Sequence, residues 1–171
     1  LRLQVNSMVL YDGFCWNEVT LVPHGLVRVN RMALEIPLRR ERCRYVYRGH
    51  AQAGHALSPL GLQCPLLPNL WLGDEERGLA WMTESQEWSR AQDRGRQVEV
   101  LPGGATSLWR TCFLDTPTDL REPYTARFAL HVTPAKPVSL RKSRIFHGAY
   151  YGLEQDRVQG ALEIPADGHL D

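Results

Sequence analysis

The chain has 171 residues, of which 43% are hydrophobic and 23% are charged. This length suits one domain with its own hydrophobic core, and this composition excludes wholesale disorder. The formal net charge is +1, with 20 basic and 19 acidic residues, which predicts no strong attraction to nucleic acid or to an anionic membrane. No apolar run approaches the roughly 18 residues of a membrane span. The chain starts at Leu1 without a signal-like segment, and we expect it to be a piece of a longer protein.

The first third of the chain shows the alternation of apolar and polar residues that is typical of strands. Residues 2–10 predict one strand, Asp12-Gly13 a turn, and Phe14–Val22 a second strand. Residues 32–38 alternate strictly and predict a half-buried strand. Because Pro37 has no N–H, we expect this strand at a sheet edge or close to a strand end.

The next segment contains one further strand and a long loop. Arg42–Arg48 predicts a strand with tyrosines on one face and arginines on the other. Gly49–Pro68 has no sustained period and predicts a loop of about twenty residues. His50 and His55 lie in this loop, but no third ligand is in view, so we predict no metal site.

A β-hairpin is predicted at the centre of the sequence, within Asn69–Trp88. Two apolar runs, 70–72 and 79–82, flank the polar turn Gly73-Asp-Glu-Glu-Arg-Gly78. We expect the two glycines to supply the positive φ angles that such a turn often needs.

The last third predicts three more strands. Gln97–Leu101 and Thr106–Leu114 form a second hairpin around Pro102-Gly103-Gly104. Thr106–Leu114 is apolar on both faces, which indicates an interior strand. Tyr124–Val132 alternates and ends before Pro134. Many short strands with frequent turns predict an all-β fold, an antiparallel two-sheet β-sandwich, with a closed barrel as the alternative.

Four cysteines stand far apart in the sequence and form no Cys-x-x-Cys pair, at positions Cys15, Cys43, Cys64 and Cys112. Zinc sites of the ribbon type need ligand pairs close in sequence, so we predict no metal. Three of them, Cys15, Cys43 and Cys112, fall in strand-like runs, where a free buried thiol is expected. One or two disulfides remain open as an alternative in a secreted protein.

Three stretches carry a resemblance to a known family. Trp71–Trp81, followed by Glu84-Ser85 and Trp88, resembles the central signature of the N-terminal β-sandwich domain of glycoside hydrolase family 123-type proteins. Phe128–Pro137 is similar to the element that closes that domain, and Tyr11–Phe14 to its entry strand.

The resemblance implies a sandwich over residues 1–147 that serves as a non-catalytic accessory module. Family members act on N-acetylgalactosamine-type glycosides from a separate (β/α)8 barrel, which this chain lacks. Such relatives favour an extracytoplasmic or secreted location.

The C-terminal segment, residues 148–171, is predicted to be an extension of the sandwich. Val158–Pro165 and the residues that follow resemble the opening strand of a laminin-G/concanavalin-like module. The chain stops before such a module could complete a core. We therefore expect a strand that lies on the sandwich or pairs with a neighbouring domain or chain.

No catalytic constellation and no cofactor motif is present, so we expect no catalysis by this chain alone. Sugar-binding sandwiches stack exposed aromatic rings on pyranose rings beside carboxylates. The candidate carbohydrate contacts are Trp88, Trp71, Trp81, Asp74, Glu75 and Glu84. The alternative is that the tryptophans fill the core and that the acids keep a loop tip soluble. Three functions stay open: an accessory module, a carbohydrate-binding module, and an assembly protein that uses its C-terminal strand.

Overall fold

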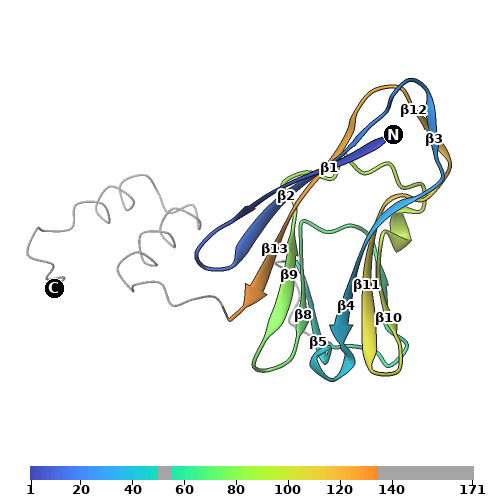
Figure 1. Cartoon of the computed structure of the whole chain (residues 1–171). Coiled ribbons are helices and arrows are strands. Elements are labelled where there is room, and N and C mark those ends of the chain that lie inside the picture. The colour runs from blue at the N-terminus through green and yellow to red at the C-terminus, as the bar shows by residue number, and fades with distance from the viewer. Residues whose placement is uncertain (50–54, 135–171) are drawn as a thin grey trace, which may run out of the picture. The chain divides into compact units, whose positions relative to one another are not determined.

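The computed structural model describes residues 1–49 and 55–134, which belong to one compact unit, Leu1–Ala135. Every pairing between its strands is antiparallel. The larger sheet has the spatial order β1-β2-β13-β9-β8-β5-β6 and the smaller one the order β4-β11-β10-β7 (Figure 1). The all-β prediction is therefore confirmed.

The strand bounds are as follows. The larger sheet contains β1 (Arg2–Val9), β2 (Phe14–Val22), β5 (Tyr45–Arg48), β6 (His55–Ala56), β8 (Asn69–Gly73), β9 (Gly78–Met82) and β13 (Tyr124–Thr133). The smaller sheet contains β4 (Met32–Arg39), β7 (Leu62–Cys64), β10 (Val98–Pro102) and β11 (Thr106–Leu114). β3 (Val27–Val29) and β12 (Thr118–Leu120) form a separate two-stranded sheet. Two 3-10 turns are present, η1 (Arg40–Arg42) and η2 (Arg94–Arg96).

The two sheets face each other across one hydrophobic core, as in a sandwich. Trp81 and Phe128 from the larger sheet and Trp109 and Phe113 from the smaller one belong to the same buried cluster. β11 pairs on both sides, with β4 and β10, as expected for a strand that is apolar on both faces. The sandwich prediction holds, and the sheets are not closed into a barrel within the described residues.

The outer face of the smaller sheet carries a cross-strand row of charges beside apolar residues. Arg110 on β11 donates to Glu35 on β4 at 2.7 Å and to Glu99 on β10 at 3.3 Å. These residues are direct partners in the strand register, so opposite charges stand side by side. The inner face of the same strands is apolar, which fixes the register because a one-residue slip would bury the charges.

Each of the two larger sheets has two edge strands in the described part of the chain, β1 and β6 in one and β4 and β7 in the other. β4 pairs with β11 alone, and β1 pairs with β2 alone. The position of Pro37 on β4 confirms the expectation of an edge, because a proline without an N–H is tolerated there. β1 is exposed along its whole length.

The sequence predictions fail in two places: they contain neither β3 nor β12, and they differ from the structure between residues 42 and 68. The predicted strand Arg42–Arg48 begins only at Tyr45, because residues 40–42 form the turn η1 and Cys43 follows it outside any strand. The predicted loop Gly49–Pro68 contains the short strands β6 and β7, which pair at sheet edges. His55 lies exposed on β6, and His50 lies outside the described residues. The boundary after residue 147 and the extension 148–171 also lie outside them and stay predictions.

All four cysteines are free thiols, and all except Cys15 are buried. Burial raises the pKa of Cys64 to about 11, so its thiol stays protonated at neutral pH. Such a thiol behaves as a small hydrophobic side chain. Of the three cysteines expected to be free and buried, Cys43 and Cys112 are so, whereas Cys15 is only half-buried.

Candidate functional site

The structure places the six candidate carbohydrate contacts in several different environments. Trp81 on β9 is fully buried, with no exposed surface. Its indole ring stacks on Phe128, with 4.7 Å between the ring centroids and 13° between the planes. A ring in this position has no face on which a sugar can stack, so Trp81 is a core residue.

Trp71 lies on the opposite, outer face of the larger sheet. Val46 and Leu72 are paired and buried in the core, so Trp71 and its partner Tyr47 point outward. Both side chains are half-buried, and the indole Nε1 of Trp71 donates to Thr133 Oγ1 at 3.0 Å. The ring lies against the backbone of both hairpin glycines, where a Cβ atom on Gly73 would stand 2.5 Å from its Cζ2.

This contact corrects the expectation about the glycines. Neither Gly73 nor Gly78 has a positive φ; the positive-φ glycines of the described chain are Gly13, Gly25, Gly49 and Gly61. Position 78 needs glycine because the Trp71 indole occupies the space of a side chain, and position 73 because the indole and the backbone of Arg77 and Gly78 do.

Asp74 holds the hairpin tip together. Its Oδ1 accepts the backbone N–H groups of Glu76 at 2.9 Å and Arg77 at 2.8 Å. Its Oδ2 accepts from Arg42 Nη1 at 2.8 Å. The hydrogen bond from Arg42, with those from the two backbone N–H groups, lowers the pKa of Asp74 to about 2 against the opposing effect of burial. Asp74 is therefore a turn-forming residue with its oxygens already engaged.

The other three candidates lie near the hairpin without forming one site. Glu75 bonds the guanidinium of Arg44 at 2.9 Å and accepts from Tyr45 Oη at 2.8 Å. Trp88 is half-buried, packs edge-on against Phe113 with 5.2 Å between the centroids, and donates from Nε1 to Thr83. Glu84 is exposed. The six residues therefore do not converge on one surface.

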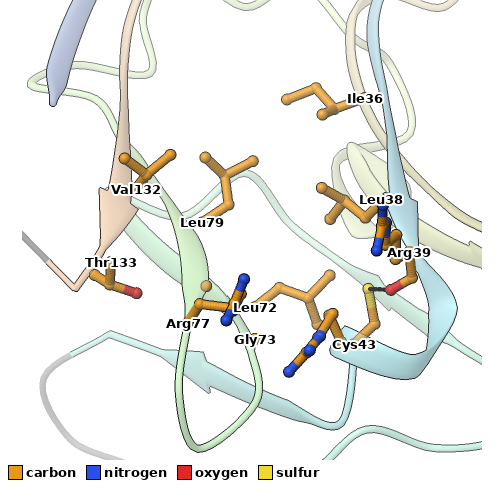
Figure 2. Close-up of a pocket in the computed structure, with 12 residues that line it drawn as sticks. Ile36, Leu38, Arg39, Cys43, Leu72, Gly73, Arg77, Leu79, Val132 and Thr133 are labelled. Atoms are coloured by element: carbon orange, nitrogen blue, oxygen red, sulfur yellow. Dashed lines mark hydrogen bonds between the residues drawn. The ribbon is translucent and has the colours of Figure 1, made fainter.

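The sequence did not reveal a groove that runs along β4. Two cavities, of about 430 and 500 Å³, follow one another between β4 and β13. We call them together the β4 groove; β4 lines one wall through Met32–Arg39. The other wall is apolar and comes from the inner face of the larger sheet, including Leu3, Val5, Val19, Leu79, Leu130 and Val132. Figure 2 shows Leu79 and Val132 facing Ile36 and Leu38 across it.

The apolar side chains that β1 contributes to the groove are exposed, although they lie on the inner face of the larger sheet. Leu3 is 60% exposed and Val5 55%, and both share a face with the core residues of β2 through the pairs Leu3–Leu21 and Val5–Val19. Within residues 1–49 and 55–134, the smaller sheet ends at β4 and does not extend over them. The alternation in residues 2–10 predicts an inward apolar face, but it carries no signal for whether another strand covers that face.

The charged side chains that line the two cavities are all arginines. Arg31 lies at one end, and Arg39, Arg42 and Arg77 lie at the other. Arg42 and Arg77 also contact acids of the hairpin tip, Asp74 and Glu76. The β4 groove thus combines apolar walls with arginine side chains at both ends.

No group of three His, Cys, Asp or Glu side chains suitable for a metal ion occurs in residues 1–49 and 55–134. Over the same residues, no helix has the length and apolar character to cross a membrane. Comparisons with protein-family models, with curated proteins and with solved structures found no match to this chain.

Replacing Asp74 by asparagine should reduce the loss of folding stability that occurs as the pH falls from about 4 to about 2. Asp74 has a folded pKa of about 2, below the value of about 3.9 for an unfolded aspartate. Its stabilising contribution is therefore fully present above about pH 4 and is lost as the pH falls toward about 2. Urea midpoints from pH 7 to pH 2 should show Asp74→Asn less stable at pH 7, with a smaller fall at low pH. The control is Glu84→Gln, which removes an exposed carboxylate; profiles of all three proteins that run parallel would contradict the assignment.

Proposed function

We propose that this chain is a non-catalytic accessory module of a glycoside hydrolase-like protein, and that it works by docking a polypeptide segment in the β4 groove. The observation that carries the proposal is the groove itself. It offers an apolar wall and two strand edges, β4 and β1, that have no further partner in the described residues.

The physical argument is that such a surface favours a polypeptide over a sugar. An exposed apolar face next to a strand edge supplies hydrophobic contacts to alternate side chains and backbone hydrogen bonds to an added strand. Proteins rarely leave such edges open unless a partner covers them. Sugar recognition would instead need hydrogen-bonding groups around an aromatic platform, and the groove is lined mainly by aliphatic side chains.

The link to glycoside hydrolase-like proteins rests on the resemblance of the central hairpin. The residues of that signature stabilise the hairpin in this fold. Trp71 packs on Gly73 and Gly78, and Asp74 accepts hydrogen bonds from the backbone of the hairpin tip. They build a rigid hairpin in the middle of the larger sheet. This supports an accessory role, because the carboxylates at the hairpin tip, Asp74, Glu75 and Glu76, already accept hydrogen bonds from neighbouring side chains.

Photo-crosslinking of the full chain tests the docking function. A benzophenone amino acid replaces Val5, which faces the groove, and in a matched variant it replaces Gln4, which faces outward from the same strand. We expect Val5 to form a covalent product with a polypeptide, found by peptide mass mapping, and Gln4 to form none. A Val5 probe that reacts with no polypeptide would overturn the proposal, as would turnover of aryl glycosides by the purified chain.

Carbohydrate recognition is the second candidate function, and the outer face of the larger sheet favours it. Trp71 and Tyr47 are neighbouring half-exposed aromatic residues there, with Tyr45 and Glu75 beside them. This candidate predicts sugar-dependent quenching of tryptophan fluorescence that Tyr47→Ala abolishes and Trp88→Ala leaves in place. A glycan panel with no binding to the full chain would remove it.

A further inference from the structure

We infer that the free edge of β1 pairs with β1 of a second copy of this chain. The two strands run antiparallel across a two-fold axis perpendicular to the sheet, so the larger sheets of the two copies join into one. This pairing does not depend on the docking function, because a segment docked in the β4 groove can use the edge of β4, which belongs to the other sheet. Each chain of the pair therefore keeps its own groove.

The first eleven residues carry most of the exposed apolar side chains in residues 1–49 and 55–134. Ten large hydrophobic side chains are exposed there, and seven of them are Leu1, Leu3, Val5, Met8, Val9, Leu10 and Tyr11. Leu3, Val5 and Val9 lie on the inner face of the sheet, whereas Met8 lies on the outer face because successive side chains alternate. A strand that adds at the edge of β1 packs against both faces at once, and a partner docked on one face does not.

Of the four edge strands of the two larger sheets in the described residues, β1 alone is both long and free of charge along its middle. β6 has two residues and β7 has three. β4 has eight residues but carries Pro37, which lacks an N–H, and the charged side chains of Glu35 and Arg39. β1 also has eight residues, and it contains no charge, proline or glycine from Leu3 to Val9. Proteins protect long edges with such residues unless the edge is paired.

The free backbone groups of β1 belong to alternate residues, and the turn after β1 shows which ones. The N–H of Leu10 donates to the carbonyl of Phe14 at 2.8 Å, and its carbonyl accepts from the N–H of Gly13 at 3.1 Å. Leu10 thus directs both groups toward β2, and in an antiparallel strand the next residue directs its groups the other way. The groups at the free edge therefore belong to the odd-numbered residues, Leu3, Val5, Ser7 and Val9.

β1 is complementary to itself when Asn6 of one copy stands opposite Asn6 of the other. Odd-numbered residues then oppose odd-numbered residues, so the free groups of the two edges meet and can form about eight backbone hydrogen bonds. Inner faces also lie beside inner faces, and apolar side chains meet on both sides of the joined sheet. The opposed pairs, each present twice, are Leu3–Val9, Val5–Ser7 and Gln4–Met8.

Charge permits this pairing. Arg2, the charged residue of β1, stands opposite Leu10 in this register, so the arginines of the two copies lie at opposite ends, about 27 Å apart. The partner of Asn6 on β2 is Glu18, whose carboxylate already accepts from Arg127 at 2.9 Å. A neutral strand that opposes itself without like charges favours a second copy over a charged partner.

The shared contact is small, and we expect a dimer that dissociates readily. β1 contributes eight residues from each chain, against roughly 20–30 residues a side in a standard interface. We expect a dissociation constant on the order of 0.1 mM, which gives single chains at about 1 μM and mostly pairs at about 1 mM. Photo-crosslinking at about 1 μM therefore tests the docking function on single chains, in which Gln4 has no second copy beside it.

Sedimentation velocity of the full chain from about 1 μM to about 1 mM tests the pairing. The wild type should change from the mass of one chain, 19.5 kDa, toward the mass of two. Asn6→Lys places like charges opposite each other at the axis and should weaken association at least about fivefold. The matched control Gln63→Lys adds the same charge at an exposed position on the edge of β7 and should associate as the wild type does.

A charge-exchange experiment tests the register. An equimolar mixture of Asn6→Lys and Asn6→Asp should associate more tightly than either variant alone, because opposite charges then meet across the axis. Asn6 is exposed, so both variants should keep the circular dichroism spectrum of the wild type.

Three results would overturn the inference. A wild type that keeps the mass of one chain at about 1 mM would exclude the pairing. Association that Asn6→Lys leaves unchanged, or that Gln63→Lys weakens equally, would exclude β1 as the contact. A mixture no tighter than the separate variants would exclude the two-fold register at Asn6. All three leave the docking function in place, since the Val5 crosslink tests it on single chains.

Discussion

Replacing Trp81 by alanine should lower the free energy of unfolding by about 4 kcal/mol, in the range for large aromatic residues removed from a core. The indole is fully buried, stacks on Phe128 and also packs on Phe113 at 6.4 Å between ring centroids. Its removal opens a cavity where the two sheets meet, and the neighbouring rings can fill it only in part. Urea unfolding followed by far-ultraviolet circular dichroism measures the loss.

Two further variants make this prediction specific. Trp88→Ala, at a half-buried ring, should cost about 2 kcal/mol because less apolar area leaves the core. Trp81→Phe should cost less than about 1.5 kcal/mol. The buried Nε1 of Trp81 finds no acceptor among the described residues, so phenylalanine keeps the stacking and removes an unpaired donor. A cost below about 1 kcal/mol for Trp81→Ala would contradict its place in the core.

The strands were predictable because their physical cause is local. In residues 14–22 and 32–38 the alternation reflects one face on the core and one on solvent, and the structure places β2 and β4 there. The prediction failed at Arg42–Arg44 because the turn η1 depends on long-range contacts, among them a hydrogen bond from Arg40 N to Ala105 O. The alternation of seven residues contains no information about a contact with a segment about sixty positions away in the sequence.

The orientations of Trp71 and Trp81 agree with the alternation of their strands, although the expectation that the tryptophans fill the core is correct for Trp81 and wrong for Trp71. Trp71 lies between Leu70 and Leu72, which face the core, so Trp71 faces outward, whereas Trp81 shares the parity of Leu79 and faces inward. The β4 groove, in contrast, could not be predicted from the alternation of residues. Residues 2–10 have the same pattern whether or not a strand covers them, so an uncovered face becomes visible only when the number and order of strands in the opposite sheet are known.

Replacing Gly78 by alanine should lower the free energy of unfolding by about 2–3 kcal/mol, although an alanine in a strand is normally better tolerated than a glycine. An added Cβ at Gly78 meets the Trp71 ring first, through its Cε2, Cζ2 and Nε1 atoms. The ring must move, and it then loses the hydrogen bond to Thr133. Urea unfolding of Gly78→Ala beside Gly104→Ala measures the effect; a Cβ at Gly104 meets nothing within 4 Å, so that control should stay within about 0.5 kcal/mol of the wild type.

A double-mutant cycle identifies the Trp71 ring as the cause. In a Trp71→Ala background, Gly78→Ala should cost less than about 1 kcal/mol, because the space that the indole filled is then empty. Gly73→Ala should stay costly in the same background, since a Cβ at Gly73 also meets the backbone carbonyl oxygen of Arg77 and the Cα of Gly78, which Trp71→Ala leaves in place. Rescue of Gly78→Ala without rescue of Gly73→Ala therefore requires the indole to pack across Gly78 on the outer face of the sheet. Equal costs for Gly78→Ala in both backgrounds would show that backbone conformation sets the glycine requirement, and they would remove Trp71 from the explanation of the hairpin.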